Sequence, residues 1–305
     1  MPFNAKQNAA ILALFGVIAS ETYGLEREAL HATEFVPMQT GIAPFAPSFA
    51  YKVISDVGMA KFVADYADDL PPVGRFLKVE SVGIRTIAIS YAYSNVELEQ
   101  YLSIGVDVSR DDAISARHYI DTKVDEVILV GDDQQGLTGL FNNENVTVVA
   151  SPNNAAGTST KLKNKDLSEI VKTVQAMVDG AYGVNKGTIV LDSIIFSHEA
   201  YSYLSTTPVS ANNSTSILNY LKEIFREQGI VNWNESRKLD DIGVGGVGRA
   251  VLYKKSPTIL AFVLPIPFRQ EEAQPHALHY KVPCYARIGG TVIKNPKGLV
   301  YCDGI

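Results

Sequence analysis

The segment from Ser109 to Gly131 constrains the fold of this chain more than any other feature. It opens with a serine and with Asp111 and Asp112, which suit the positive end of a helix dipole. Apolar residues then recur every three or four positions, at Ala113, Ala116, Ile120, Val124 and Val127. At 1.5 Å per residue this pattern predicts a helix about 30 Å long, which can serve as the backbone of a domain.

The composition excludes several classes of protein. The chain has 305 residues, of which 46% are hydrophobic and 20% charged, so it can bury a sizeable core and is not intrinsically disordered. Its 27 Lys and Arg against 33 Asp and Glu give a net charge of −6. Without basic blocks, this balance argues against a dedicated nucleic-acid-binding protein. The length suits two domains or one elaborated domain.

The cysteines and the longest apolar run indicate neither a disulfide scaffold nor a membrane span. Cys284 and Cys302 have no CxxC spacing, which also argues against structural zinc. The apolar run Ala9 to Ala19 is about half of the roughly 20 residues that a membrane helix needs. Lys6 before it allows a signal-peptide core as an alternative. Its helical spacing favours a packing helix, so the chain is expected to be intracellular at synthesis.

Two further segments predict extended structure. Residues 35–51 mix three prolines with aromatic residues, which predicts an extended segment lying on another surface. Residues 75–93 are rich in β-branched and aromatic residues on both sides of Ser81-Val82-Gly83, which predicts a long hairpin or strand pair. An isolated hairpin is marginal in water, so we expect a neighbouring surface to cover it, in this subunit or another one.

The second half of the chain has an α/β pattern. Two features precede this pattern. Ser94 to Glu97 is a capping box that opens a short helix, and the polar segment Ser151 to Lys165 predicts a loop. The polar tract Ser205 to Ser216 predicts a surface loop. The expected later elements are helices over 167–178 and 217–225, strands over 188–197, 249–254 and 258–265, and a strand–turn–strand over 286–305.

Gly243 to Gly248 has the letters of the dinucleotide-binding motif G-x-G-x-x-G. That motif needs a strand before it and a helix after it. Here it follows Leu239-Asp240-Asp241, and the strand-like residues 249–254 follow it. The context therefore predicts a loop that leads into a strand.

The other candidate chemical groups also favour structural roles. The pairs Asp111-Asp112, Asp132-Asp133 and Glu271-Glu272 are adjacent residues, which predicts caps or solvated turns rather than catalytic carboxylates. His276 and His279 have a spacing that could hold a metal on a helix. Pro275 beside them and the lack of a third ligand favour surface or interface histidines. With no nucleophile or phosphate-binding motif, the sequence predicts no enzyme, no cofactor and no metal.

Residues 91–142 resemble the major capsid proteins of tailed bacteriophages, which have the Hong Kong 97 type fold and share it with encapsulins. The similarity lies in an aromatic strand and a polar cap, a helix start, a long helix and a glycine-rich turn. These are Tyr91 to Ser94, Val108-Ser109-Arg110, the helix to Val130, Gly131-Asp132 and Gly136 to Asn142. Residues 286–305 are similar to the returning strand pair of that family.

The resemblance implies an α+β fold of the Hong Kong 97 type in four regions. These are an N-terminal arm (residues 1–50), an E-loop region (51–93), a P domain with a long spine helix (94–146 and 272–305) and an α/β A domain (147–271). It also implies contacts between subunits. The expected contact residues are Phe35, Phe45, Phe49, Arg75, Phe76, Lys78, Arg85, Arg110 and Asn295. Some members of the family form Lys-to-Asn isopeptide cross-links between subunits. Lys78 and Asn295 do not match a cross-link motif, so this activity is not carried over to the chain.

The function implied by the resemblance is a major capsid protein. Many copies would form an icosahedral shell around the double-stranded DNA of a tailed phage or prophage. The shell would assemble in the bacterial cytoplasm and become the capsid of the virion. Scaffold, portal or decoration proteins are the expected partners, DNA is contacted non-specifically, and no membrane is involved. One alternative is an encapsulin-like compartment that packages an enzyme. The other is a nucleotide-dependent enzyme built on residues 166–265, which predicts a small oligomer with saturable ligand binding.

Overall fold

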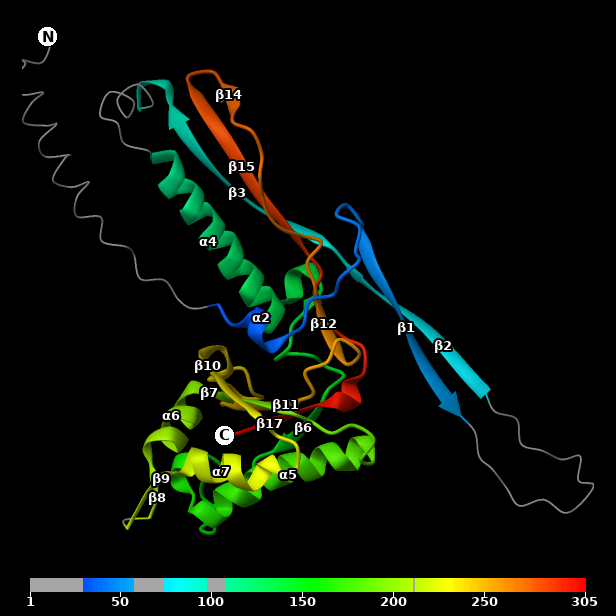
Figure 1. The fold of residues 1–305 in the computed structure, drawn as a ribbon, viewed down its shortest axis with the longest axis vertical. Helices are drawn as coiled ribbons and strands as arrows, with labels where there is room; N and C mark the ends of the chain where they lie inside the picture. Colours follow the sequence, from blue (N-terminus) through cyan, green and yellow to red (C-terminus); the bar gives the residue numbers. More distant parts are fainter. Residues whose placement is uncertain (1–29, 58–73, 98–107, 211) are drawn as a thin grey trace, which may run out of the picture. The chain divides into compact units, whose positions relative to one another are not determined.

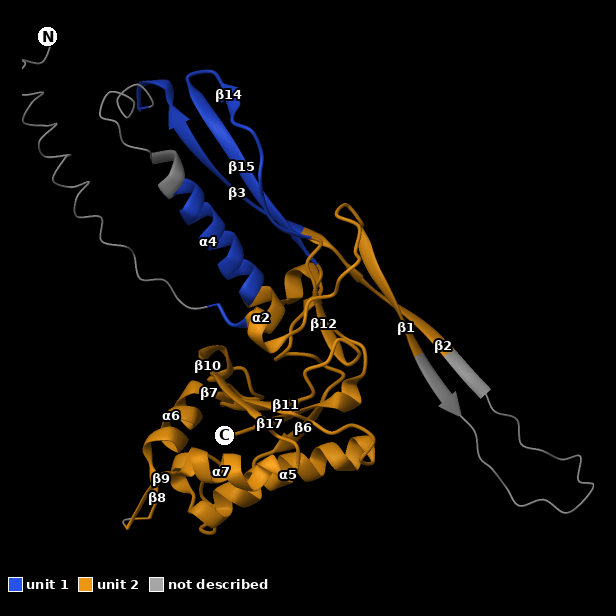
Figure 2. Cartoon of the chain, viewed as in Figure 1, with its two compact units in different colours: residues 1–31, 86–125, 266–288 blue, residues 32–85, 126–265, 289–305 orange. Residues whose placement is uncertain are grey.

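The computed structural model describes residues 30–57, 74–97, 108–210 and 212–305 (Figure 1). The chain divides into two compact units (Figure 2). Unit 1 contains residues 1–31, 86–125 and 266–288, and unit 2 contains residues 32–85, 126–265 and 289–305. The predicted helix at Ala9 to Ala19 lies outside the described residues.

Unit 1 is built on the predicted long helix. This helix, α4, runs over Val108–Leu129 and buries Ala116, Ile120 and Val124, which confirms the periodicity of the sequence. The strands of the unit are β3 (Arg85–Ser94), β13 (Ile266–Gln270), β14 (Gln274–His276) and β15 (His279–Ile288). β15 pairs with all three others, and its even-numbered residues from Val282 to Ile288 are buried. This alternation gives β15 one core face. The predicted capping box also forms, since the Ser94 N–H donates to Glu97 Oε2 at 2.9 Å.

Unit 2 contains a five-stranded sheet. Its strands are β6 (Thr147–Ala150), β7 (Ser193–Ser197), β10 (Asn232–Ser236), β11 (Arg249–Tyr253) and β17 (Leu299–Asp303). Their order is β10-β7-β11-β17-β6, with β10 parallel to β7, β17 parallel to β6, and the two inner pairings antiparallel. Every residue of β7 and β11 is buried, as expected for strands covered on both faces.

Three helices pack their apolar residues into the core of unit 2. They are α5 (Leu167–Asn185), α6 (His198–Thr206) and α7 (Ile217–Arg226). A capping box between Asp166 and Glu169 starts α5, which is longer than predicted. The sequence did not predict α6, because it is short and has a mixed polar and aromatic composition. The predicted surface loop at 205–216 contains the end of α6 and the short hairpin of β8 (Pro208–Ser210) and β9 (Asn213–Ser216).

A two-stranded ribbon projects from unit 2, and its register corrects one prediction. β1 (Ser48–Val57) pairs antiparallel with β2 (Gly74–Gly83), from Ser48 opposite Gly83 to Val57 opposite Gly74. Residues 75–93 therefore do not form a hairpin around Gly83. The single residue Ile84 separates β2 from β3; its N–H donates to the Pro47 carbonyl and its side chain is buried. The chain thus changes its pairing partner at this point and does not reverse.

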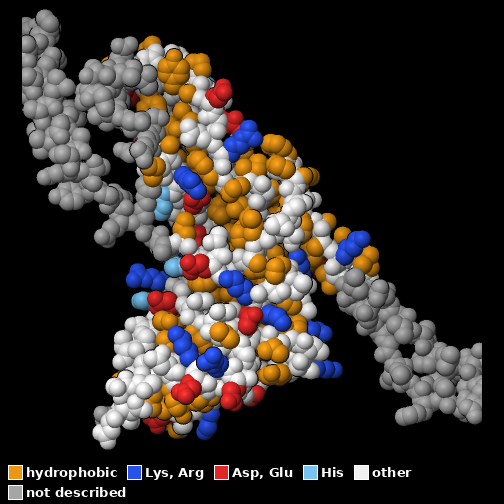
Figure 3. All heavy atoms as spheres, viewed as in Figure 1, with side chains coloured by type: hydrophobic (Ala, Val, Ile, Leu, Met, Phe, Trp, Pro, Cys, Tyr) orange, Lys and Arg blue, Asp and Glu red, His pale blue; other side chains and the backbone are white. Residues whose placement is uncertain are grey.

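The remaining described elements belong to unit 2. They are α2 (Ala32–Phe35), the pair β4 (Gly131–Asp132) with β5 (Leu137–Thr138), the pair β12 (Leu260–Val263) with β16 (Gly290–Ile293), and four short 3-10 turns: η1 (Asp133–Gln135), η2 (Leu162–Asn164), η3 (Arg237–Leu239) and η4 (Pro296–Gly298). None of the described helices is long and apolar enough to cross a membrane. On the face shown in Figure 3, basic and acidic side chains are interspersed.

Candidate assembly surfaces

The β1–β2 ribbon is the clearest candidate for a contact between subunits. Among the described residues it is a sheet of two strands, so the outer edge of each strand carries unpaired backbone groups. Leu77 and Val79 on β2 are 56% and 59% exposed. Two strands alone bury too little apolar surface to be stable in water. The ribbon therefore suits a partner surface that covers these apolar side chains.

Polar contacts fix the two strands of the ribbon to each other. Tyr51 on β1 donates its hydroxyl to Glu80 Oε2 at 2.6 Å, and Lys78 Nζ lies 2.7 Å from Glu80 Oε1. Burial, together with the Glu80 carboxylate, raises the pKa of Tyr51 above its ordinary range. The hydrogen bonds from Lys78 and Tyr51 lower the pKa of Glu80. The carboxylate is therefore ionised at neutral pH and bridges the strands.

A small apolar cluster anchors the base of the ribbon in unit 2. Ile84, Val263 and Val292 are buried in it, and Phe49 and Tyr51 pack against them. The Phe49 and Tyr51 rings are stacked, with their centroids 6.3 Å apart. This arrangement supports one end of the ribbon and leaves Leu77 and Val79 exposed.

The expected contact residues whose side chains the structure describes differ widely in burial. Phe35 is 2% exposed and its carbonyl accepts a hydrogen bond from Tyr253, so its side chain packs inside its own subunit. Phe45 is 68% exposed, and Lys78 and Arg85 are also exposed.

The other expected contact residues have mixed positions. Phe49 is half-buried at the base of the ribbon. Asn295 caps η4, where its side chain accepts a hydrogen bond from the Lys297 N–H. Arg75 and Phe76 belong to β2 and Arg110 to α4, but their side chains lie outside the described part of the structure.

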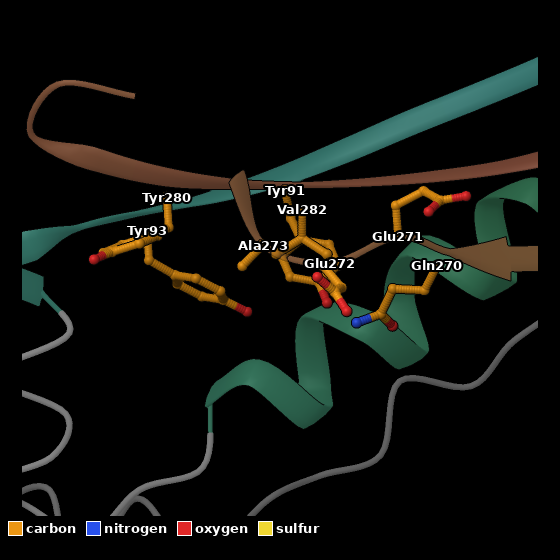
Figure 4. Close-up of a pocket in the computed structure, with 8 residues that line it drawn as sticks. All are labelled: Tyr91, Tyr93, Gln270, Glu271, Glu272, Ala273, Tyr280 and Val282. Atoms are coloured by element: carbon orange, nitrogen blue, oxygen red, sulfur yellow. The ribbon is translucent and has the colours of Figure 1, made fainter. Parts of the chain in front are cut away.

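Unit 1 has a recess of about 530 Å³ with an aromatic and an acidic part (Figure 4). Tyr91 and Tyr93 on β3 meet edge to face, with centroids 5.5 Å apart, and Tyr280 and Val282 of β15 lie beside them. The remaining lining residues are the consecutive residues Gln270 to Ala273. Tyrosines beside carboxylates suit a basic side chain of a partner. Tyr91 to Tyr93 and Glu271-Glu272 are separate features of the sequence, and nothing in the sequence brings them together.

A buried ion pair holds the C-terminal strand of the sheet in unit 2. Arg249 on β11 donates to Asp303 on β17, with Nε–Oδ1 at 2.5 Å and Nη2–Oδ2 at 2.9 Å. Its Nη1 donates to the Phe141 carbonyl at 2.7 Å, and its guanidinium lies 4.6 Å from the centroid of the Tyr301 ring. Burial raises the pKa of Asp303, but the Arg249 and Val244 hydrogen bonds outweigh it, so the net shift is downward.

The same ion pair explains the glycine motif at 243–248. The Val244 N–H donates to Asp303 Oδ2, and the N–H groups of Gly304 and Ile305 donate to the Gly248 carbonyl. The motif is thus a tight loop that leads into β11, as predicted, and it binds the end of the chain. These contacts occupy the loop and do not support the nucleotide-dependent enzyme on residues 166–265.

Lys165 is the second buried cation of unit 2. Its Nζ lies 2.8 Å from the hydroxyl oxygens of Ser151 and Thr173, and desolvation lowers its pKa. Each hydroxyl in turn donates to a backbone carbonyl. The contacts attach the 151–165 loop to α5. No group of three or more metal-ligating side chains lies among the residues that the structure describes.

The ribbon, the long helix and the α/β unit together define a capsid protein of the Hong Kong 97 type, and solved structures confirm the fold. The chain is similar to the capsid protein of Myoviridae phage XM1, with a TM-score of 0.78, 16% identity, and coverage of 94% of this chain and 95% of that chain. It is also similar to the virus-like particle from Pyrococcus furiosus, with a TM-score of 0.53, 17% identity, and coverage of 98% and 100%. The capsid of the empty GTA particle gives a TM-score of 0.64, 11% identity, and coverage of 92% and 91%.

The sequence itself identifies the family. The profile of the major capsid protein family matches residues 58–305, so the chain belongs to that family. Comparison with curated proteins gives no match. The predicted α+β fold and the predicted function as a major capsid protein are thereby confirmed. Its role is structural, in a shell built from many copies of the chain.

Proposed function

We propose that this chain forms the icosahedral shell of a tailed phage or prophage, assembles in the bacterial cytoplasm and encloses double-stranded DNA. The observation that carries the proposal is the β1–β2 ribbon, whose exposed Leu77 and Val79 need a covering surface. A neighbouring copy that covers the ribbon makes the same contact in turn, and a repeated contact of this kind closes into a symmetric shell.

The proposal assigns roles to the regions of the chain. Residues 1–50 act as the N-terminal arm and residues 51–93 as the E-loop region, whose first strand begins already at Ser48. Residues 94–146 and 272–305 act as the P domain, and residues 147–271 as the A domain. The last strand, β17, is an exception, because it pairs with β6 and β11 of the A-domain segment and belongs with that domain. The exposed side chains of Phe45, Lys78 and Arg85 are suited to contacts with other subunits, and we keep them as proposed contact residues.

The charge of the chain fits a container that holds DNA by confinement. Its net charge is −6, and the face in Figure 3 has no continuous patch of Lys and Arg. Strong phosphate binding would need such a patch. DNA contacts in the shell are therefore weak and independent of sequence. A scaffold, a portal or a decoration protein would complete the assembly, and the Tyr–Glu recess of unit 1 is available for a basic side chain of a partner.

Sedimentation and negative-stain microscopy of the purified full chain test this proposal, together with the ratio of absorbance at 260 and 280 nm. Closed particles in the megadalton range are expected, with nucleic acid in particles isolated from a lysogen. Closed particles that carry a folded enzyme would instead support the alternative, an encapsulin-like compartment. A small oligomer that stays soluble even with the neighbouring structural proteins co-expressed would contradict both.

A further inference from the structure

The hairpin of β14 and β15 has a histidine on each side of its turn. His276 and His279 are direct register partners, separated by Ala277 and Leu278. Register partners in an antiparallel pair point to the same side, with Cβ atoms about 4.5–5.5 Å apart. Both histidines are exposed. The sequence favoured surface or interface histidines, because Pro275 argues against the helix on which this spacing could hold a metal. The hairpin brings the two imidazoles together in a different way.

The two imidazole rings already face each other. Their centroids are 5.7 Å apart and their planes differ by 16°. Two nitrogens that bind one tetrahedral ion at 2.0–2.1 Å lie about 3.3 Å apart. Because both side chains are exposed, rotation about their χ angles can close this difference while the backbone stays in place.

The turn between the histidines is held in position. Ala277 has a φ of 48°, in the left-handed region that a two-residue hairpin turn uses. The Leu278 carbonyl accepts a hydrogen bond from the Asn95 N–H at 2.9 Å, which ties the tip to the end of β3. The histidines are therefore preorganised, so less conformational entropy is lost when they bind a common ligand.

The surroundings of the pair select the type of ligand. Gln274 and Lys281 form the next register pair on the same side of the hairpin, whereas Tyr280 points to the opposite side. The ammonium group of Lys281 on the same side disfavours calcium and magnesium, which prefer several oxygen ligands. Imidazole nitrogen suits zinc, nickel and copper. The hairpin supplies two such nitrogens, and water can fill the other coordination positions.

We propose that His276 and His279 together chelate one divalent transition-metal ion, of the zinc, nickel or copper type, at the tip of the β14–β15 hairpin. The ion joins the two strands across their turn. This site depends on the hairpin alone, so its test is independent of whether the chain encloses DNA.

Calorimetric titration of the purified full chain with zinc chloride, in a buffer that does not bind metal, tests the proposal. The wild-type chain is expected to bind one ion per copy. His276→Ala and His279→Ala should each weaken binding about a hundredfold, because either change removes the intramolecular second ligand. The double variant should lose little more than each single variant, since both substitutions break the same chelate.

Matched variants distinguish chelation from other effects. His118→Ala, in α4, removes a histidine that contacts Thr122 and should leave zinc affinity unchanged. His276→Gln and His279→Gln keep a polar side chain and should weaken binding as the alanines do. The proposal is wrong if the wild-type chain binds no zinc at millimolar concentration, or if the single variants keep the wild-type affinity. It is also wrong if they only halve the number of bound ions, which would indicate two independent histidines. Sedimentation of each variant checks that it remains folded.

Discussion

Arg249 and Asp303 form a two-point ion pair in which the side chains are 5% and 10% exposed. They lie on adjacent antiparallel strands, where Arg249 of β11 is the register partner of Asp303 of β17. A buried pair of this kind costs much desolvation energy to form, but loss of one partner leaves an uncompensated charge. The pair therefore fixes the register of β17 more than it adds net stability.

We expect Arg249→Ala to lower the free energy of unfolding by about 3–5 kcal/mol, because it leaves the Asp303 carboxylate buried without its cation. Denaturant unfolding of the purified chain measures this. Arg226→Ala, on the exposed end of α7, is the control and should stay within about 0.5 kcal/mol of wild type. The double variant Arg249→Met/Asp303→Leu should recover part of the loss. Equal losses for both arginines would contradict the role of the pair.

The same carboxylate predicts a pH dependence. Its hydrogen bonds with Arg249 and Val244 hold the folded-state pKa of Asp303 below the value of about 3.9 in an unfolded chain. Its contribution to stability is therefore present above about pH 4 and is lost as the pH falls below it. The difference in unfolding free energy between wild type and Asp303→Asn should be constant at neutral pH and shrink below about pH 4. A difference that stays constant down to pH 2 would contradict this.

Lys165 leads to the opposite expectation from Arg249. Both hydroxyls that it contacts also donate to backbone carbonyls, so Lys165→Met leaves them with partners and removes a desolvated charge. We expect that variant to unfold within about 1 kcal/mol of wild type or to be more stable. Lys165→Ala should lose about 2 kcal/mol, because it leaves a cavity. Thermal unfolding compares the two.

Alkaline titration gives an independent check on Lys165. Desolvation lowers its folded-state pKa below the unfolded value of about 10.4, so the unfolded chain binds more protons between those two values. Wild-type stability relative to Lys165→Met should therefore rise with pH through this range. A fall over the same range would show that the folded chain favours the charged form.

Two glycines should respond to alanine in opposite directions. A Cβ on Gly139 would lie 2.3 Å from the backbone carbon of Val130 and 2.5 Å from the Gly131 nitrogen, so backbone would have to move. Gly139→Ala should prevent stable folding or cost more than about 3 kcal/mol. A Cβ on Gly183, in α5, meets nothing within 4 Å. Gly183→Ala should add about 0.5–1 kcal/mol, since glycine is a poor helix former. Circular dichroism during heating measures both.

The exposed side chains of the ribbon should matter for assembly and little for the single subunit. Leu77→Asp and Val79→Asp place a charge on side chains that are more than half exposed, so subunit unfolding should change by less than about 0.5 kcal/mol. The yield of closed particles should fall at least about tenfold, because a small penalty is repeated in every copy. Val231→Asp, at a residue 67% exposed in unit 2, is the matched control. Normal particle yield from both ribbon variants would remove the ribbon from the proposed contacts.

Local periodicity allowed a large part of the fold to be predicted. The apolar spacing from Ala113 to Val127 predicted α4, and the apolar residues after Leu167 predicted α5. The strand composition of residues 75–93 was also recognised correctly. The hairpin within it was not correct, because alternation shows that a segment is extended but does not show which strand pairs with it. The true partners, β1 and β15, lie on both sides of that segment in the sequence.

The assembly surfaces were less predictable than the fold. Phe35 was expected to contact another subunit, but its side chain is buried in unit 2, since the aromatic composition of a segment does not show which surface covers it. The Tyr–Glu recess combines residues of β3, of β15, and of the end of β13 with the segment after it. Single-sequence periodicity carries no information on such long-range proximity. Asp303 and Arg249 are likewise 54 positions apart.

The position of β17 sets an order of events during synthesis. This strand pairs with β11 on one side and with β6 on the other, so until residues 299–303 exist β11 has only β7 beside it and β6 has no neighbour in the sheet. A growing chain on the ribosome carries β6 for about 150 residues of elongation before the strand that pairs with it is made. At roughly 5–20 residues per second, that interval lasts on the order of ten seconds. The five-stranded sheet closes only after this point, so a partly translated chain has no complete unit 2 to offer to a growing shell.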